Sequence, residues 1–142
     1  MPLFSQKDLL AIAIVVDIAA QGDRLVKVGE IETRFQVPKR HFETLIQALA
    51  ANGILAGQRG RLGGYELARD SSLIDAGDIL RAVRAVEMAD AKIARNRISE
   101  NVVIPALREA ERAFSEALRR ITVEQLVRSV QKLYDLPRFP AT

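Results

Sequence analysis

The central part of the chain combines a helix, a stop signal and two short strands in an order that restricts the fold. Pro38 suits the first turn of a helix, and Asn52-Gly53 predicts its end because these residues tolerate left-handed conformations. Strand-like segments follow at Ile54–Ala56 and Tyr65–Leu67, and the glycine-rich turn Arg59–Gly64 joins them. The pattern predicts a helix that leads directly into a β-hairpin.

The helix predicted over 38–51 has two unlike faces at 3.6 residues per turn. The apolar face, which should pack on a core, consists of Phe42, Leu45, Ile46 and Leu49. The opposite face carries side chains that can meet phosphates and base edges in a DNA major groove: Lys39, Arg40, Glu43, Thr44 and Gln47. Taken alone, such a face is most often only solvated.

The hairpin turn places Arg59 and Arg61 at a predicted exposed tip. The turn also contains glycines that allow the backbone to approach another molecule closely: Gly60, Gly63 and Gly64. Residues 34–61 hold five cationic side chains and one acidic one, a balance of +4 against +3 for the whole chain. Helix, stop and basic hairpin together are typical of a winged helix-turn-helix, whose helix enters the major groove and whose wing reaches an adjacent groove.

The segments before this unit complete a mainly helical domain. Ser5 and Asp8 resemble a capping box that starts an apolar helix over 6–20, which should be buried on more than one side. The segment 27–35 has apolar residues at helical spacing and reads as the first helix of the helix-turn-helix, with Gln36-Val37 as the turn.

The segments after the hairpin predict four further features. Asp75–Asp78 offers a cap for a helix to about Val86, and 87–99 reads as a loop or a loosely held helix. Apolar residues then recur with a period of about 3.5: Val103, Leu107, Ala110, Phe114, Ala117 and Ile121. A helix packed on its own domain would explain this seam; we favour pairing across a dimer. Thr122–Gln125 is a further capping box, and its helix should end before Pro137.

Composition excludes several classes of site. The chain has 142 residues, no cysteine and a single histidine, which rules out disulfides, thiolate-bound zinc and ordinary iron–sulfur ligation. There is no cysteine nucleophile and no phosphate-binding Gly-Lys-Ser loop, so we expect no catalysis, no metal and no cofactor. The apolar run 9–20 contains Asp17 and is too short to span a bilayer, and we expect a cytoplasmic protein with no membrane contact.

In several segments the sequence resembles the Rrf2 family of bacterial winged helix-turn-helix transcription regulators. The resembling segments are Val28–Ile31, Phe42–Leu49, Asn52–Leu55, Arg59–Arg69, Asp78–Val83 and Ile121–Val127. These segments are distributed over most of the chain, from 28 to 127. The motif RGxxGGYxLAR, at Arg59–Arg69, is the most specific feature of the resemblance.

The resemblance implies a homodimeric, mainly α protein with a small β-hairpin wing and a long C-terminal dimerisation helix. It implies that Arg59 approaches the minor groove and that double-stranded DNA is contacted by Lys39, Arg40, Glu43, Thr44, Gln47, Arg59, Gly60, Arg61, Gly63, Gly64 and Tyr65. His41 lies where the family often has a tyrosine. Sensor members hold an iron–sulfur cluster through three cysteines in a segment that corresponds to about 87–104, and this chain has none.

These observations lead to one functional expectation and one alternative. We expect a DNA-binding domain over 1–87 and a linker, dimerisation helix and last helix over 88–142. The protein should be a dimeric repressor at a pseudo-palindromic operator, without a cysteine-ligated cluster and with its effector, a small molecule or a protein, left open. The alternative is a winged-helix module that docks on a protein rather than on DNA.

Overall fold

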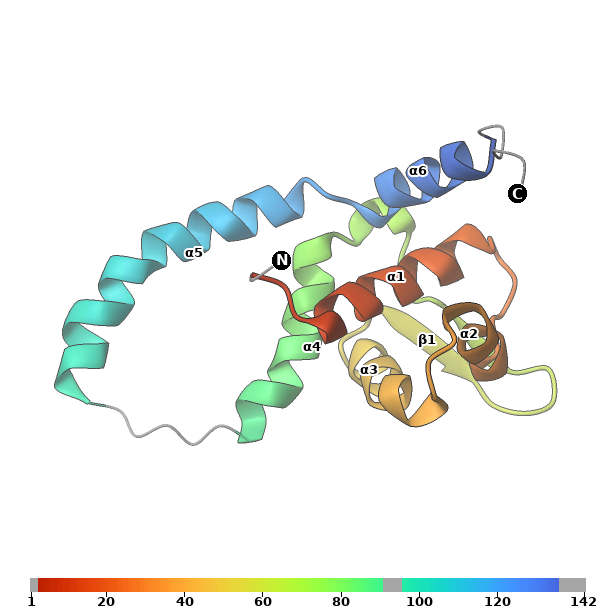
Figure 1. The fold of residues 1–142 in the computed structure, drawn as a ribbon, viewed down its shortest axis with the longest axis horizontal. Helices are drawn as coiled ribbons and strands as arrows, with labels where there is room; N and C mark the ends of the chain where they lie inside the picture. The colour runs from red at the N-terminus through yellow and green to blue at the C-terminus, as the bar shows by residue number, and fades with distance from the viewer. Residues whose placement is uncertain (1–2, 91–95, 136–142) are drawn as a thin grey trace, which may run out of the picture.

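The computed structural model describes residues 3–90 and 96–135, which form six α-helices and one two-stranded antiparallel hairpin (Figure 1). In chain order the elements are α1 (Gln6–Ala20), α2 (Val28–Phe35), α3 (Lys39–Ala51), β1 (Leu55–Gln58), β2 (Gly64–Leu67), the 3-10 turn η1 (Ser71–Leu73), α4 (Ala76–Asp90), the π-helical turn η2 (Ser99–Val103), α5 (Ile104–Arg119) and α6 (Val123–Asp135). The predicted fold class, mainly α with a small hairpin wing, is confirmed.

Helix α1 runs through the middle of the domain. Its start is the predicted capping box: the Ser5 N–H donates to the Asp8 carboxylate at 2.9 Å, and the Asp8 N–H donates to the Ser5 hydroxyl at 3.1 Å. Apolar side chains on several sides of the helix are buried, including Ile14, Val15 and Ile18. α1 contacts α3, α4, α6 and β2, which confirms that it is buried on more than one side.

Helices α2 and α3 form the predicted helix-turn-helix. Gln36, in the turn, has the left-handed φ of 54°. α3 begins at Lys39, one residue later than predicted, because Pro38 has an extended ψ of 141° and acts as the N-cap. The predicted core face is confirmed, since Phe42, Leu45, Ile46 and Leu49 are all buried.

The hairpin follows α3 almost immediately. Gly53 has a φ of 73° and ends the helix, as predicted. β1 begins at Leu55 rather than at Ile54 and extends to Gln58, since Gly57 pairs with Tyr65 and Gln58 with Gly64. The predicted strands were therefore too short, because cross-strand pairing extends β1 through residues that have little strand propensity of their own.

Helix α4 begins at a reciprocal cap in which the Asp75 and Asp78 side chains accept from each other's backbone N–H groups at 2.9 and 3.0 Å, as predicted. The helix continues to Asp90, and helical structure resumes by Arg97. For these parts of 87–99 the loop alternative is wrong and the helical one is correct. Alanine-rich, charged sequence favours a helix without supplying an apolar face.

Helix α6 returns to the central domain. It starts at the predicted capping box, where the Thr122 hydroxyl accepts from the Gln125 N–H at 3.2 Å. Val123 is fully buried in the same core as α1 and α3, and α6 packs along α1. The division into 1–87 and 88–142 stays a prediction. Among the described residues, no helix is long and apolar enough to cross a membrane.

Asp8 also joins α1 to α4. Its buried carboxylate receives a hydrogen bond from Arg84 at 3.0 Å, and the same Arg84 nitrogen donates to the Leu3 carbonyl. Burial raises the pKa of Asp8, but the bonds from Arg84 and Ser5 outweigh it and hold the pKa below its usual value. The ionised carboxylate therefore stabilises the folded state.

Replacing Asp8 by Ala should lower the free energy of unfolding by about 1–3 kcal/mol, since it removes a cap and leaves Arg84 without its carboxylate. Because the folded pKa is depressed, this stabilisation is present above about pH 4 and declines as pH falls through the folded pKa. Urea unfolding at pH 7 and in acid measures both effects. The control Arg128→Ala removes an exposed ion pair and should change stability by less than about 1 kcal/mol. Equal stability of Asp8→Ala and the unaltered protein would contradict the assignment.

Candidate nucleic-acid interface

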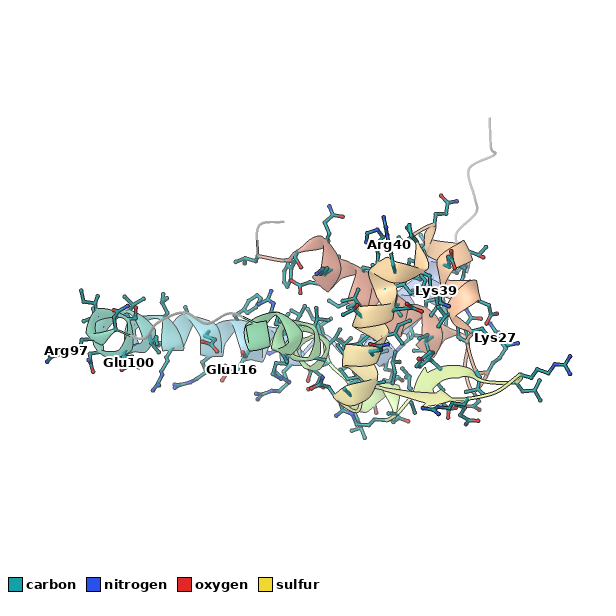
Figure 2. All side chains as sticks on the ribbon, turned by 90° about the horizontal axis from the view of Figure 1, so that it is seen from below. Lys27, Lys39, Arg40, Arg97, Glu100 and Glu116 are labelled. Atoms are coloured by element: carbon teal, nitrogen blue, oxygen red, sulfur yellow. The ribbon has the colours of Figure 1, made fainter. Side chains whose placement is uncertain are left out.

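The outer face of α3 is a continuous polar surface. All five residues predicted to read DNA are exposed: Lys39, Arg40, Glu43, Thr44 and Gln47. The helix is held from behind by its buried apolar face, so these side chains are presented on a fixed support. Figure 2, seen from below, shows Lys39 and Arg40 on the α3 ribbon with the hairpin projecting beside it.

Two charges on this face are paired with each other and one is not. Lys39 Nζ lies 3.5 Å from the Glu43 carboxylate, an exposed pair one helical turn apart that contributes little to stability. In the described part of the chain, no carboxylate forms an ion pair with Arg40. Arg40 can therefore bind a phosphate or a guanine edge without losing an internal partner.

The hairpin forms a wing with a basic tip. Arg59 and Arg61 are exposed. Leu62, which directly follows Arg61, is 88% exposed. Over the described ranges neither arginine has an acidic partner. A Cβ on Gly63 would lie 2.1 Å from the Gln58 carbonyl, so only glycine allows the turn to close this tightly. The two cations are thus carried on a compact turn.

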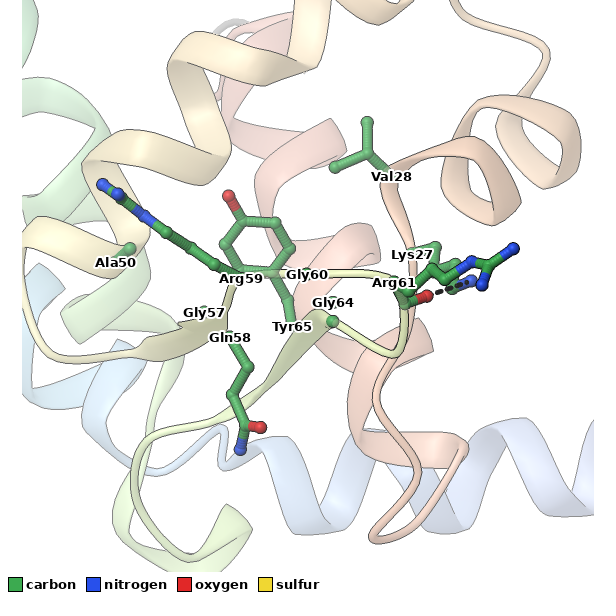
Figure 3. Close-up of a pocket in the computed structure, with 11 residues that line it drawn as sticks. Lys27, Val28, Ala50, Gly57, Gln58, Arg59, Gly60, Arg61, Gly64 and Tyr65 are labelled. Atoms are coloured by element: carbon green, nitrogen blue, oxygen red, sulfur yellow. Dashed lines mark hydrogen bonds between the residues drawn. The ribbon is translucent and has the colours of Figure 1, made fainter.

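A hollow of about 450 Å³ lies between the wing and the start of α2. In Figure 3 the Tyr65 ring stands at its centre, Arg59 points toward α3, and Arg61 points the other way, toward Lys27. Tyr65 lies across Gly57 on the neighbouring strand, where a Cβ would be 3.0 Å from the ring. Tyr65 and the half-buried Gly64 thus help to build the wing, and their contact with DNA stays a prediction.

One cation in the predicted basic segment has a structural role. Arg34 on α2 forms a two-pronged ion pair with Asp17 on α1, with nitrogen–oxygen distances of 2.6 to 3.0 Å. Its charge is therefore neutralised within the domain. The local excess of positive charge at the interface comes from α3 and the wing instead.

Lys27 was not among the predicted interface residues. It precedes α2, yet its side chain reaches the wing and donates to the Arg61 carbonyl at 3.0 Å. These residues are 34 positions apart, and no local sequence pattern connects them. The only feature of the sequence that could have pointed to Lys27 as an interface residue is its positive charge at a predicted helix start.

The predicted seam lies mostly on an uncovered helix. α5 packs against α4 only near its C-terminal end, where Leu118 is buried and Phe114 is half-buried with its ring 5.7 Å from that of Phe4. Toward the N-terminal end, Val103 and Leu107 are 42% and 59% exposed. Ala110, Ala117 and Ile121 are exposed as well. In Figure 1, α5 extends well away from the domain.

The fold and the exposed basic surface define a winged helix-turn-helix protein. The model of the Rrf2 family, described as "Iron-dependent Transcriptional regulator", matches residues 4–129, and the chain belongs to this family of transcription regulators.

Solved structures give the same fold. IscR from T. potens is 23% identical with a TM-score of 0.69, covering 98% of this chain and 93% of that one. CymR of B. subtilis, titled the global cysteine regulator, is 23% identical with a TM-score of 0.66, covering 89% and 96%. CymR of Staphylococcus aureus is 23% identical with a TM-score of 0.63, covering 87% and 96%.

The iron dependence in the family description does not fit the donors of this chain. The sequence has no cysteine, and its one histidine, His41, lies exposed on α3. Within the described residues, no three side chains of His, Cys, Asp or Glu gather where they could hold a metal ion. A thiolate-bound cluster therefore has no ligands here.

Proposed function

We propose that this family member is a sequence-specific DNA-binding regulator, acting in the bacterial cytoplasm as a homodimeric repressor at a pseudo-palindromic operator. The observation that carries the proposal is the combination of an exposed polar face on α3 with a wing tip whose two arginines have no acidic partner in the described ranges. Cations held without internal partners form favourable contacts with phosphates.

Each structural part has a separate task in this proposal. α3 lies in a major groove, where Arg40 and Gln47 can donate to base edges and Glu43 can accept from cytosine. The wing enters the adjacent minor groove with Arg59, whose guanidinium favours its negative potential. Repression needs only that the bound protein occupy promoter DNA.

The dimer is supported by the apolar face of α5. Isolated apolar side chains are common on protein surfaces, but here four of the six seam residues follow one another along α5, with Val103 in the preceding π-helical turn and Ile121 just beyond the end of the helix. Pairing α5 with its copy would cover the exposed seam and set two copies of α3 about 34–36 Å apart, one helical turn of DNA. The seam consists of Val103, Leu107, Ala110, Phe114, Ala117 and Ile121.

The alternative is that the wing docks on a protein. Leu62, 88% exposed at the wing tip, favours it, because an exposed apolar side chain suits a protein surface. The wing arginines favour DNA. Sequence-selective binding to duplex DNA distinguishes the two.

Replacing Arg59 by Ala should weaken binding to an operator duplex selected from a random library about 10–100-fold. This is the effect expected for loss of one specific contact of about 1–3 kcal/mol. Fluorescence anisotropy with labelled duplex at constant salt measures the change. Arg128→Ala, which removes the same charge from α6 on the opposite side of the domain, is the control and should bind normally. Unchanged affinity of Arg59→Ala would refute the role of the wing.

Replacing Leu107 by Asp should convert the dimer to a monomer, because it places a charge within the apolar seam. Sedimentation velocity at micromolar concentration measures the mass. The control Arg112→Asp places the same residue on the side of α5 opposite the seam and should remain dimeric. A monomeric unaltered protein, or a dimeric Leu107→Asp, would rule out this interface.

A further inference from the structure

The wing is attached to the rest of the domain at two levels. At its base, Val26 and Tyr65 exchange two backbone hydrogen bonds of 2.8 Å, so the segment before α2 pairs with β2 at one isolated antiparallel bridge. A Cβ on Gly64 would lie 2.8 Å from the Val26 carbonyl, which shows how closely these backbones approach. Nearer the tip, Lys27 Nζ donates to the Arg61 carbonyl at 3.0 Å (Figure 3).

The backbone of Lys27 is a fixed point. Its N–H donates to the Glu30 carboxylate at 2.8 Å, and Glu30 in turn accepts from Arg24 at 2.7 Å. The hydrogen bonds from the Lys27 N–H and from Arg24 hold the pKa of Glu30 below its usual value, so the carboxylate stays ionised. The backbone from which the Lys27 side chain extends is therefore held in place at the start of α2.

The wing tip has few other restraints. Ladder pairing between β1 and β2 ends at Gln58 and Gly64, and within the turn the Gly63 N–H donates to the Gly60 carbonyl at 3.0 Å. Among the described residues, Lys27 is the only one outside the hairpin whose side chain forms a hydrogen bond with residues 59–62. Its loss would leave the tip held by the strands alone.

We propose that Lys27 is a positioning residue that holds the wing tip in place relative to α3, so that the tip arginines meet DNA already ordered. This inference rests on the proposed function. A tip that is ordered before binding loses less conformational entropy on binding, and affinity rises accordingly. Lys27 acts through the Arg61 backbone, not as a direct phosphate contact.

The test uses the full-length variant Lys27→Met, which keeps the length and apolar stem of the side chain but removes the donor. Amide hydrogen exchange across Arg59–Gly63 should become at least about threefold faster, whereas exchange in α1 should not change. Binding to the duplex recovered from a random library should weaken about 3–10-fold, as loss of one exposed hydrogen bond predicts. Lys132→Met on α6 is the matched control and should alter neither.

Two further readouts separate positioning from direct contact. The slope of log affinity against log salt should be the same for Lys27→Met and the unaltered protein, because no phosphate contact is removed. In an Arg59→Ala/Arg61→Ala background, Lys27→Met should cause no additional loss. The proposal would be overturned by a salt slope for Lys27→Met that is smaller by about one, or by an additional loss of affinity in the double-alanine background. Unchanged amide exchange at the wing tip in Lys27→Met would overturn it as well. A different result would separate the two proposals. If neither the unaltered protein nor Lys27→Met bound DNA selectively, but amide exchange at the wing tip was still faster in Lys27→Met, the proposed function would fail and the positioning role of Lys27 would stand.

Discussion

Burial of α1 is the interaction on which the rest of the structure depends. This apolar helix contacts α3, α4, α6 and β2, and each fully buried aliphatic side chain contributes about 1.5–3 kcal/mol. α3 packs against α1, and the hairpin follows α3 directly in the chain. Arg34 ties α2 to α1 through Asp17, and Arg84 ties α4 to α1 through Asp8. The proposed DNA-binding surface is thus fixed from the interior outward.

Local chemistry explains what could be predicted from the sequence. Capping boxes at Ser5 and Thr122 act within four residues, and the apolar face of α3 repeats with the helical period, so both are visible in the chain itself. The exposed set on α3 follows from the same periodicity, and the exposed wing tip follows from the glycine-rich turn between the two strands. The family resemblance added the expectation of a homodimer and of a minor-groove contact by Arg59.

Long-range contacts explain what could not be predicted. The ion pair between Arg34 and Asp17 removes one cation from a segment that looked uniformly basic, and the bond from Lys27 to Arg61 adds a residue to the wing. The extension of β1 through Gly57 and Gln58 depends on pairing with β2. Each of these depends on which segments meet in space, information that no local pattern carries.

In the proposed function, the exposed face of α3 and the wing together read a two-fold-symmetric DNA sequence. Selection of bound duplexes from a random library, with the unaltered protein at near-physiological salt, tests it most directly. We expect a pseudo-palindromic motif whose half-sites lie about one helical turn, 10–10.5 base pairs, apart. Retention of DNA without any motif, lost as salt rises, would contradict the claim and favour the protein-docking alternative.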